Sequence, residues 1–376
     1  METRFDLRWV LGITQAEPVE PELFQLLQLI HERGSLQAAA KECRISYRHA
    51  WGLMQKWKRL LGQPLAHLER GRGTTLTRLG QKLLWGQRRI HARLGPTLES
   101  LASEIAIELR DAMSVENSGP PLRVSASHGF AIPLLRDLLH AKRGLDLDLQ
   151  FRGSLDCLRL LSGSKCDMAG FHLPEGSLGT RLAPRFRRYL DPKTQVLIYA
   201  VRRRQGLITA KQNPKRIESV ADLVKRSVRF INRQPGSGTR MIVDLLLEDA
   251  GVSPDRIQGY NTEEFTHMAV AAIVASGAAD VGFGIEAAAG QFHLNFIPVT
   301  WENYWFAVSR ETLASLTVSE MISMLRSAEF REQAGALPGY DTARSGIIVP
   351  VDIAFQKNNY TSMVGEPFTR ARSERI

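Results

Sequence analysis

Four segments in the C-terminal two-thirds of the chain place small hydroxyl, amide or basic side chains directly after a predicted buried strand. They are Ser127-His128, Gly153-Ser154, Gly170-Phe171-His172 and the run NRQPGSGTR from Asn232 to Arg240. Hydroxyl groups, and the unpaired N–H groups at the start of a following helix, are donors that suit an anion. In the last segment, two glycines let backbone amides turn inward while Ser237 and Thr239 add hydroxyls. We expect these segments to bind an oxyanion, and ordinary helix capping is the alternative.

Motifs for enzymatic chemistry do not occur in the sequence. It has no P-loop, no GxGxxG fingerprint, no GxSxG elbow and no HExxH pair. The three cysteines, Cys43, Cys157 and Cys166, lack CxxC spacing, so we expect reduced thiols and no metal site. We therefore expect no enzyme and no cofactor. An acyl-transfer enzyme that uses Ser, His and Asp in a cleft is the alternative.

The strands that precede these polar segments are predicted to belong to a β-sheet. Short apolar strands alternate with helices along this part of the chain, which is typical of an α/β fold with open sheets. In such sheets, ligands bind beyond the carboxyl ends of the strands. The predicted strands are 122–127, 145–151, 168–171, 195–201, 228–232, 281–284 and 296–300.

Positive charge is concentrated in one N-terminal segment of the 376-residue chain. The formal net charge is +10, and residues 41–93 hold 13 lysines and arginines against two acidic residues. The rest of the chain holds 36 basic and 37 acidic residues. A local basic excess of this kind is typical of a protein that binds a polyanion such as double-stranded DNA. A solvated surface is the alternative.

The same segment has the pattern of a winged helix-turn-helix. Apolar residues recur at helical spacing over 22–32, Ser35 and Ser46 can cap a second and a third helix, and strands at 65–68 and 75–77 flank a glycine-rich wing. The start of the third helix then enters the major groove, so Tyr47, Arg48 and His49 are predicted to contact bases, with packing as the alternative for Tyr47 and His49. The predicted DNA-binding residues are Ser46, Tyr47, Arg48, His49, Lys56, Lys58, Arg70, Arg72 and Arg78.

A further helix, capped by Thr77, carries an apolar seam formed by Leu94, Leu98, Leu101, Ile105 and Leu109. This spacing suits pairing with a second helix, so we expect a homodimer or a higher oligomer. Packing within one chain is the alternative. Gly95-Pro96 predicts a kink or a helix restart in this region.

These features divide the chain into a winged helix-turn-helix domain (1–77), a linker and dimerisation helix (78–113) and a ligand-sensing domain (122–350). The segment 114–121 is polar and rich in Gly and Pro, as expected of a linker, and a flexible tail is expected over 361–376. We see no membrane span and no secretory signal, so a cytoplasmic protein is expected.

The N-terminal region resembles a known family of regulators. The run GSLQAAAKECRISYRHAWGLMQKWKRLLG, which starts at Gly34, and the later run LTRLGQKLL resemble the winged-helix domain of ModE-type molybdate-responsive regulators. A weaker resemblance connects them to LysR-type regulators.

The C-terminal region is similar to type II periplasmic-binding-protein-like domains, which are found in bacterial regulators and beside molybdopterin biosynthesis proteins. The matching runs are QPGSGTR at 234–240 and GYNTEEFTHMAVAAIVASGAADVGFGIEAAA at 259–289. The resemblance implies two lobes with a ligand cleft between them. The chain would form the first lobe to about Tyr199, cross to the second lobe, and return near 304–308. The resemblance places Ser127, Ser154, Gly236, Ser237, Gly238, Thr239, His267 and Tyr304 in that cleft, and His128, His172 and Arg233 would add charge.

Together these observations predict an α/β protein with an N-terminal winged helix-turn-helix that regulates transcription in response to a small ligand. By resemblance, the effector is an oxyanion such as molybdate or tungstate, or else a molybdenum-cofactor-related molecule or a small organic acid. The alternatives are an enzyme and a ligand-binding protein that serves uptake or acts in the cytoplasm.

Overall fold

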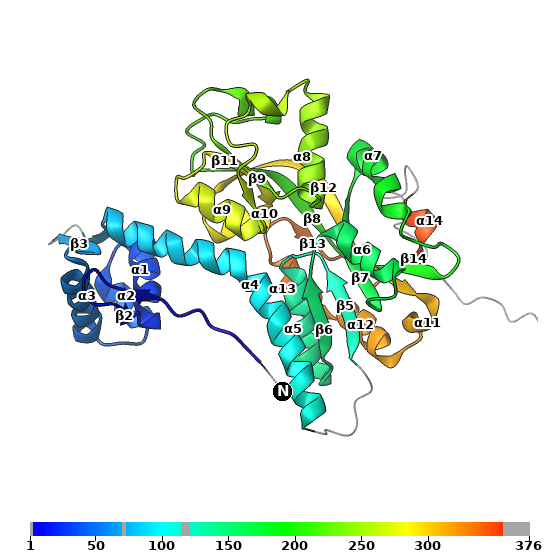
Figure 1. Cartoon of the computed structure of the whole chain (residues 1–376), viewed down its shortest axis with the longest axis horizontal. Helices are drawn as coiled ribbons and strands as arrows, with labels where there is room; N and C mark the ends of the chain where they lie inside the picture. Colours follow the sequence, from blue (N-terminus) through cyan, green and yellow to red (C-terminus); the bar gives the residue numbers. More distant parts are fainter. Residues whose placement is uncertain (1–2, 70–72, 114–120, 356–376) are drawn as a thin grey trace, which may run out of the picture.

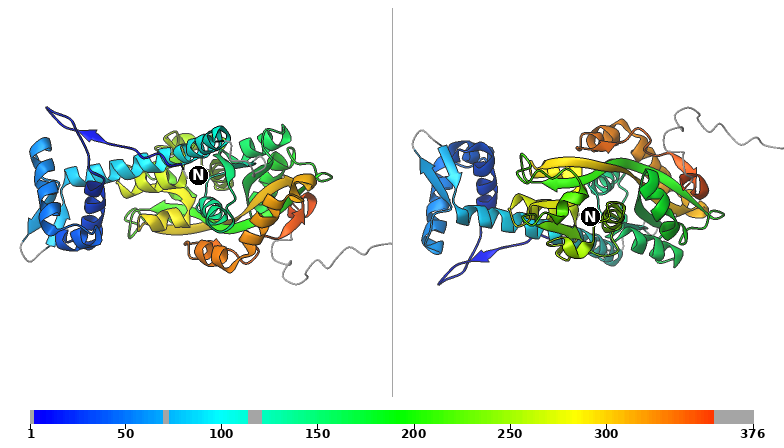
Figure 2. Two further views of the ribbon diagram at one scale, coloured as in Figure 1. Left: turned by 90° about the horizontal axis from the view of Figure 1, so that it is seen from below. Right: turned by 90° about the horizontal axis from the view of Figure 1, so that it is seen from above.

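The computed structural model describes residues 3–69, 73–113 and 121–355, apart from the side chains of residues 69, 110 and 111. A small N-terminal group of helices projects from a larger C-terminal domain along the helix α4 (Arg78–Ala112), as Figures 1 and 2 show. The predicted tail at 361–376, and all of the predicted linker except Pro121, lie outside the described residues.

The N-terminal domain is the predicted winged helix-turn-helix. Its buried core includes Leu26, Trp57 and Leu76, which come from the first helix, the third helix and the hairpin. Gly34 ends the first helix in the left-handed conformation, with φ of 66°, as a residue without a side chain permits. The elements are β1 (Val10–Leu11), β2 (Glu17–Pro18), α1 (Pro21–Arg33), α2 (Leu36–Glu42), α3 (Tyr47–Leu61), β3 (Ala66–Glu69) and β4 (Gly73–Leu76).

Helix α4 begins where the sequence predicts, because the Thr77 hydroxyl accepts a hydrogen bond from the Gly80 N–H at 3.1 Å. Pro96 lies inside the helix, so the chain does not restart there. Figure 1 shows that the axis of α4 bends between the half near the N-terminal domain and the half along the C-terminal domain. A proline within a helix is a usual cause of such a bend.

One mixed sheet of ten strands runs through the whole C-terminal domain, in the predicted α/β fold. Its order is β10-β9-β11-β8-β12-β7-β5-β6, and β13 and β14 also pair with β8. We call the region around β5, β6 and β7 the first lobe and that around β9, β10 and β11 the second lobe. The strands are β5 (Leu122–Ala126), β6 (Leu147–Phe151), β7 (Met168–Pro174), β8 (Gln195–Thr209), β9 (Phe230–Arg233), β10 (Glu263–Glu264), β11 (Val281–Ile285), β12 (Asn295–Ser309), β13 (Tyr340–Asp341) and β14 (Ile348–Pro350).

The antiparallel pair β8 and β12 connects the two lobes. Each of these strands has 15 residues and therefore spans about 50 Å at roughly 3.3 Å per residue. Both are longer than predicted because polar residues interrupt their apolar pattern at the middle. Along β12, Tyr304 and Phe306 belong to one core cluster and Trp305 belongs to the other, as the alternation of a sheet buried on both faces requires.

Helices cover both sides of this sheet (Figure 2). None of the helices in the described ranges is long and apolar enough to span a membrane. The helices of the C-terminal domain are α5 (Ala131–Arg143), α6 (Ser154–Ser162), α7 (Gly176–Arg187), η1 (Val220–Val224), α8 (Gly238–Asp249), η2 (Pro254–Arg256), α9 (His267–Ala275), α10 (Glu286–Gln291), α11 (Arg310–Leu313), α12 (Leu316–Arg326), α13 (Ala328–Gly335) and α14 (Val351–Ala354).

Candidate functional site

The start of α3 exposes the side chains that the sequence predicts for DNA contact. Ser46 caps the helix, and its hydroxyl accepts a hydrogen bond from the His49 N–H at 3.1 Å. Tyr47, Arg48 and His49 are exposed, whereas the opposite face of α3 is buried through residues such as Trp57. An exposed helix start with basic and aromatic side chains has the form of a recognition helix.

The two lysines predicted to bind phosphates differ in their surroundings. Lys58 is exposed, but the Lys56 ammonium is paired with the carboxylates of Glu17 at 3.0 Å and Glu20 at 2.5 Å. The hydrogen bond with Glu20 is the main cause that raises the pKa of Lys56. Lys56 is therefore occupied within the domain, which differs from its predicted role.

The remaining predicted DNA-binding residues are Arg70, Arg72 and Arg78. Arg78, the first residue of α4, is exposed. Arg70 and Arg72 lie outside the described residues.

In the C-terminal domain, His172 on β7 joins two of the predicted polar loops. Its Nδ1 atom lies 3.0 Å from the Ser127 hydroxyl and 3.2 Å from the Ser154 hydroxyl. The Tyr304 hydroxyl donates to the Ser127 carbonyl oxygen at 3.0 Å, and the tyrosine ring lies edge-on to the His172 ring. All four side chains are buried. Ser127, Ser154 and Tyr304 thus hold His172 in place, while its Nε2 atom is buried with no hydrogen-bond partner in the described structure.

Arg203, at the middle of β8, lies beside this group and was not predicted. Its guanidinium is paired with the Glu302 carboxylate of β12 and donates to the His128 carbonyl oxygen at 3.4 Å. Gln205 donates to the other Glu302 oxygen at 2.6 Å. The signal in the sequence is the run of three arginines, 202–204, inside an otherwise apolar strand.

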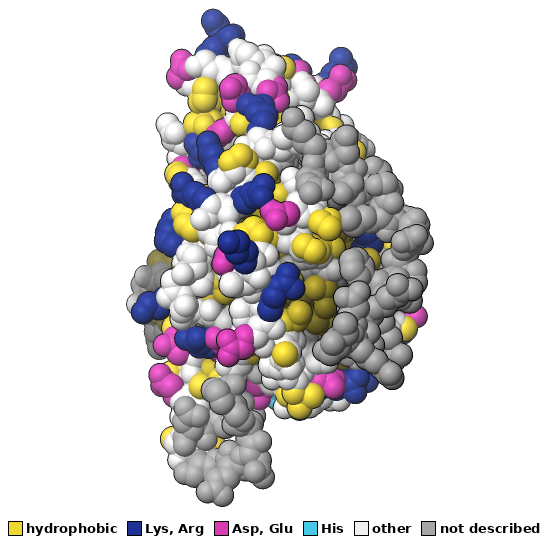
Figure 3. Space-filling model, turned by 90° about the vertical axis from the view of Figure 1, so that its right-hand side faces the viewer, with side chains coloured by type: hydrophobic (Ala, Val, Ile, Leu, Met, Phe, Trp, Pro, Cys, Tyr) yellow, Lys and Arg dark blue, Asp and Glu magenta, His cyan; other side chains and the backbone are white. Residues whose placement is uncertain are grey.

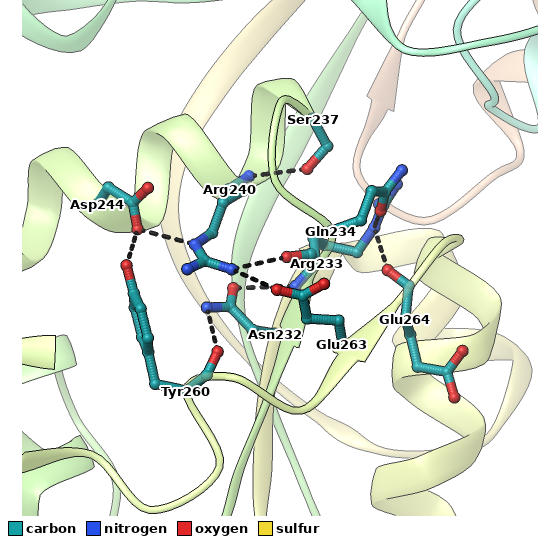
Figure 4. Close-up of polar contacts among 9 residues, drawn as sticks. All are labelled: Asn232, Arg233, Gln234, Ser237, Arg240, Asp244, Tyr260, Glu263 and Glu264. Carbon is teal, nitrogen blue, oxygen red and sulfur yellow. Dashed lines mark hydrogen bonds and ion pairs between the residues drawn. The ribbon is translucent and has the colours of Figure 1, made fainter. Parts of the chain in front are cut away.

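The last residue of β9 is Arg233, which comes from the second lobe (Figure 4). The Arg233 guanidinium donates to the carbonyl oxygens of Glu264 at 3.2 Å and Phe265 at 2.8 Å. Its Nη1 atom is buried and has no partner within the described ranges. The Arg240 guanidinium, by contrast, is bonded within the second lobe, where it donates to the Asp244 carboxylate and to the Arg233 carbonyl oxygen.

The predicted glycine-rich loop begins α8 and faces the start of α6 in the first lobe. A Cβ atom built on Gly238 would lie 3.9 Å from the Ser154 hydroxyl, and one on Gly153 would lie 3.9 Å from the Gly236 carbonyl oxygen. Gly236 needs its conformational freedom, with φ of 80°. The Ser237 hydroxyl accepts from the Arg240 N–H at 3.1 Å, so helix capping describes Ser237. Thr239 is buried beside it. The positive ends of two helices therefore converge where the lobes meet.

The point where the two lobes meet carries positive charge, and the imidazoles there are neutral. Burial, and then the positive charges of Arg203 and Arg233, lower the pKa values of His172 and His267 well below the ordinary 6.5. Burial followed by the same arginines lowers the pKa of the partly exposed His128 to about 3. Burial and Arg203 lower the pKa of Arg233 to about 10, which leaves it charged.

Four buried nitrogen atoms at this point lack a hydrogen-bond partner in the described structure: His172 Nε2, Arg203 Nη2, Arg233 Nη1 and His267 Nδ1. Buried polar atoms are nearly always hydrogen-bonded, so the group is chemically suited to receive a ligand that accepts hydrogen bonds. We call His172, Arg203, Arg233 and His267 the interlobe cluster. This cluster lies between the two lobes of a domain that is joined to a winged helix-turn-helix. Among the described residues, no group of His, Cys, Asp or Glu has the arrangement of a metal site.

Comparison with known proteins defines the family. Residues 136–326, more than half of the chain, match the model of the PBP superfamily domain, and residues 21–81 match that of bacterial regulatory helix-turn-helix proteins of the lysR family. The chain belongs to the PBP superfamily and carries a LysR-type helix-turn-helix, as predicted. The helix-turn-helix match also agrees with the prediction that the chain is not an enzyme.

Individual relatives cover the chain unevenly. The uncharacterized protein YvgK of Bacillus subtilis is 34% identical over 200 residues, which are 53% of this chain and 64% of YvgK. The transcriptional regulator ModE of Haemophilus influenzae is 35% identical over 80 residues, which are 20% of this chain and 31% of ModE. The chain thus spans less than two thirds of either protein. The resemblance to ModE, which the sequence favoured over LysR, is partial.

Solved structures of LysR-type regulators are also similar. A cysteine-to-serine mutant of OxyR from Corynebacterium glutamicum has 16% identity and a TM-score of 0.44, with 84% of this chain and 93% of that chain covered. Full-length BenM has 16% identity and a TM-score of 0.43, with 85% and 99% covered.

Proposed function

We propose that this protein is a DNA-binding transcriptional regulator that responds to a small oxyanion bound by the interlobe cluster. The observation that carries the proposal is the set of four unpartnered buried nitrogens, His172 Nε2, Arg203 Nη2, Arg233 Nη1 and His267 Nδ1. An oxyanion would supply acceptor oxygens to these atoms and would lie at the convergent starts of α6 and α8.

The geometry of His172 describes how the site would accept an anion. A neutral imidazole has one N–H, and the His172 Nδ1 atom lies within hydrogen-bond distance of the Ser154 hydroxyl. When that hydroxyl donates to Nδ1, the hydrogen resides on Nε2, and Nε2 then donates to the anion. Ser154 in this proposal acts through His172. The protein would thus use neutral imidazole donors and the positive charge of Arg233, because Glu302 neutralises Arg203.

Molybdate and tungstate are the first candidates within this class. The chain is similar over 114 residues to the molybdenum-pterin-binding protein MopB of Rhodobacter capsulatus, at 31% identity, and to ModE over a shorter stretch. A molybdenum-cofactor-related molecule shares the same anionic chemistry and is the second candidate.

The DNA-binding half of the proposal rests on the exposed start of α3 and on the local excess of basic residues. Figure 3 shows, in contrast, that basic and acidic side chains are interspersed on the end of the C-terminal domain remote from α3. We propose that residues 1–77 bind double-stranded DNA, that α4 links and pairs two chains, and that 122–350 sense the ligand. This role places the protein in the cytoplasm.

The test is a thermal-shift titration of the full chain with molybdate, tungstate, sulfate, formate and pterin compounds. A ligand that binds only the native state raises the melting temperature, and we expect this of molybdate or tungstate. Arg233→Met should abolish the rise. The matched control is Arg229→Met, because Arg229 lies just before the same strand but pairs with Asp280 at the surface. A rise that survives Arg233→Met would place the ligand elsewhere.

A further inference from the structure

Helix α4 is attached to both lobes, on opposite sides of Pro96. After Pro96, the Ser103 hydroxyl donates to the Leu147 carbonyl oxygen and accepts from the Leu149 N–H, both at 3.1 Å. These bonds fix α4 to β6, the edge strand of the first lobe. Before Pro96, the Arg93 guanidinium donates to the carboxylate of Glu264 in the second lobe at 2.6 Å.

The second attachment to that lobe depends on the proline itself. Pro96 has no N–H, so the carbonyl oxygen of Ala92, four residues earlier, loses its usual partner within the helix. The Thr266 hydroxyl donates to this oxygen at 2.8 Å. Thr266 therefore binds the one backbone acceptor that the proline leaves free, at the position where the helix bends.

The segment that holds α4 is also part of the interlobe cluster. Arg233 donates to the carbonyl oxygens of Glu264 and Phe265, and His267 directly follows Thr266. The Glu264 side chain is only 2% exposed, whereas that of Arg93 is 47% exposed, so the carboxylate of this pair is shielded from solvent and the guanidinium is half-exposed. Residues 264–267 consequently contact the proposed ligand site on one side and α4 on the other.

From these contacts, and on the basis of the proposed function, we infer that Thr266 and Glu264 are positioning residues that convert movement between the lobes into a change of the α4 bend at Pro96. An anion that draws Arg233 and His267 toward His172 would move segment 264–267 relative to β6. Because α4 is fixed to both, the helix must bend differently or one attachment must break. Either change alters the placement of the DNA-binding domain.

The ligand-free full chain tests this inference directly. A fluorescent donor at exposed Lys41 in α2 and an acceptor at exposed Glu311 in α11 report the distance from the DNA-binding domain to the first lobe. Both dyes are placed through non-natural amino acids, because the chain has three free cysteines. Thr266→Val should shift and broaden the distance distribution, and Thr266→Ser should restore it.

The matched control is Ser327→Ala. Thr266 also caps α9 by accepting from the Ala269 N–H, and Ser327 likewise caps α13 and donates to a backbone carbonyl, away from α4. A second variant, Pro96→Ala, restores the N–H that can pair with Ala92 and should shift the distribution without touching segment 264–267. If Thr266→Val and Pro96→Ala both match the wild-type distribution, the inference is wrong.

A second arm adds tungstate. In the wild type we expect a rise in melting temperature together with a shift in the dye distance. In Thr266→Val the rise should persist and the distance shift should be lost, whereas a full distance shift in that variant would overturn the coupling. If tungstate and molybdate leave the wild-type melting temperature unchanged, the proposed oxyanion function fails, and the ligand-free comparison still decides the attachment.

Discussion

Arg203 and Glu302 form an ion pair at the centre of the sheet, and each side chain is only 1% exposed. Burial disfavours the charged guanidinium, but the Glu302 carboxylate outweighs this effect and raises the pKa of Arg203. The pair joins β8 to β12 where the two lobes meet. It neutralises one of the two arginines of the interlobe cluster, so the charge available to a ligand comes chiefly from Arg233.

Replacement of Glu302 by leucine should strongly destabilise the C-terminal domain. The change leaves Arg203 charged and buried without its partner, which typically costs about 3–5 kcal/mol of unfolding free energy. The double variant Arg203→Met, Glu302→Leu should recover most of that loss, because two apolar residues replace the pair. Urea unfolding of the three proteins measures both effects. A double variant as unstable as Glu302→Leu would contradict the assigned role of the pair.

Stability should fall with decreasing pH because the buried histidines remain neutral in the native state. The native pKa values of His172 and His267 lie well below 6.5, and burial is the main cause. The unfolded chain binds these protons as the pH falls below about 6.5, so unfolding becomes easier by up to about 1.4 kcal/mol per pH unit for each histidine. Stability is highest above that pH. Urea unfolding between pH 7.5 and 5.5 measures the slope.

His172→Gln should reduce this slope, because one proton-binding difference between the two states is removed. His91→Gln is the matched control, since His91 is exposed on α4. Equal slopes in the wild type and in His172→Gln would show that His172 does not stay neutral in the native protein.

The lysines of α3 should separate DNA affinity from domain stability. Lys58→Ala removes an exposed charge, so it should weaken DNA binding and lower the salt dependence of the binding constant by about one phosphate contact. Lys56→Ala should leave that salt slope nearly unchanged, because Lys56 is occupied by Glu17 and Glu20. Its effect on stability should stay within about 1 kcal/mol, since the pair is partly exposed. Fluorescence anisotropy with promoter DNA at several salt concentrations distinguishes the two lysines, and equal slope changes would contradict the structure.

The polar loops could be predicted because local rules determine them. Ser127, Ser154 and Arg233 each stand at or beside the end of a strand, and strands of one α/β sheet carry such residues to one region. His172, predicted just past a strand at 168–171, lies within β7, which continues to Pro174. The caps Ser35, Ser46 and Thr77 follow from short-range hydrogen bonding and were predicted at the correct residues.

Arg203 and Glu302 could not be predicted in the same way. They occupy the middle of long strands, where a charged residue predicts that the strand ends. Their pairing joins residues 99 positions apart in the chain. The role of Thr266 was equally hidden, because it depends on which carbonyl Pro96 leaves free and on how α9 packs against α4. Contacts of this kind follow from tertiary packing, which a single sequence does not specify.

The apolar seam of α4 should mediate dimerisation. Within one chain, the seam residues Leu94, Leu101 and Leu109 are between 42% and 45% exposed, so packing inside the chain does not cover them. The other two, Leu98 and Ile105, are half-buried. Because a second α4 would bury this row, Leu94→Glu together with Leu101→Glu should convert the dimer to a monomer in sedimentation experiments and weaken binding to a two-half-site operator. Arg89→Glu, which changes an α4 residue outside the row, controls for the added charge. A double variant that still sediments as a dimer would exclude this face as the interface.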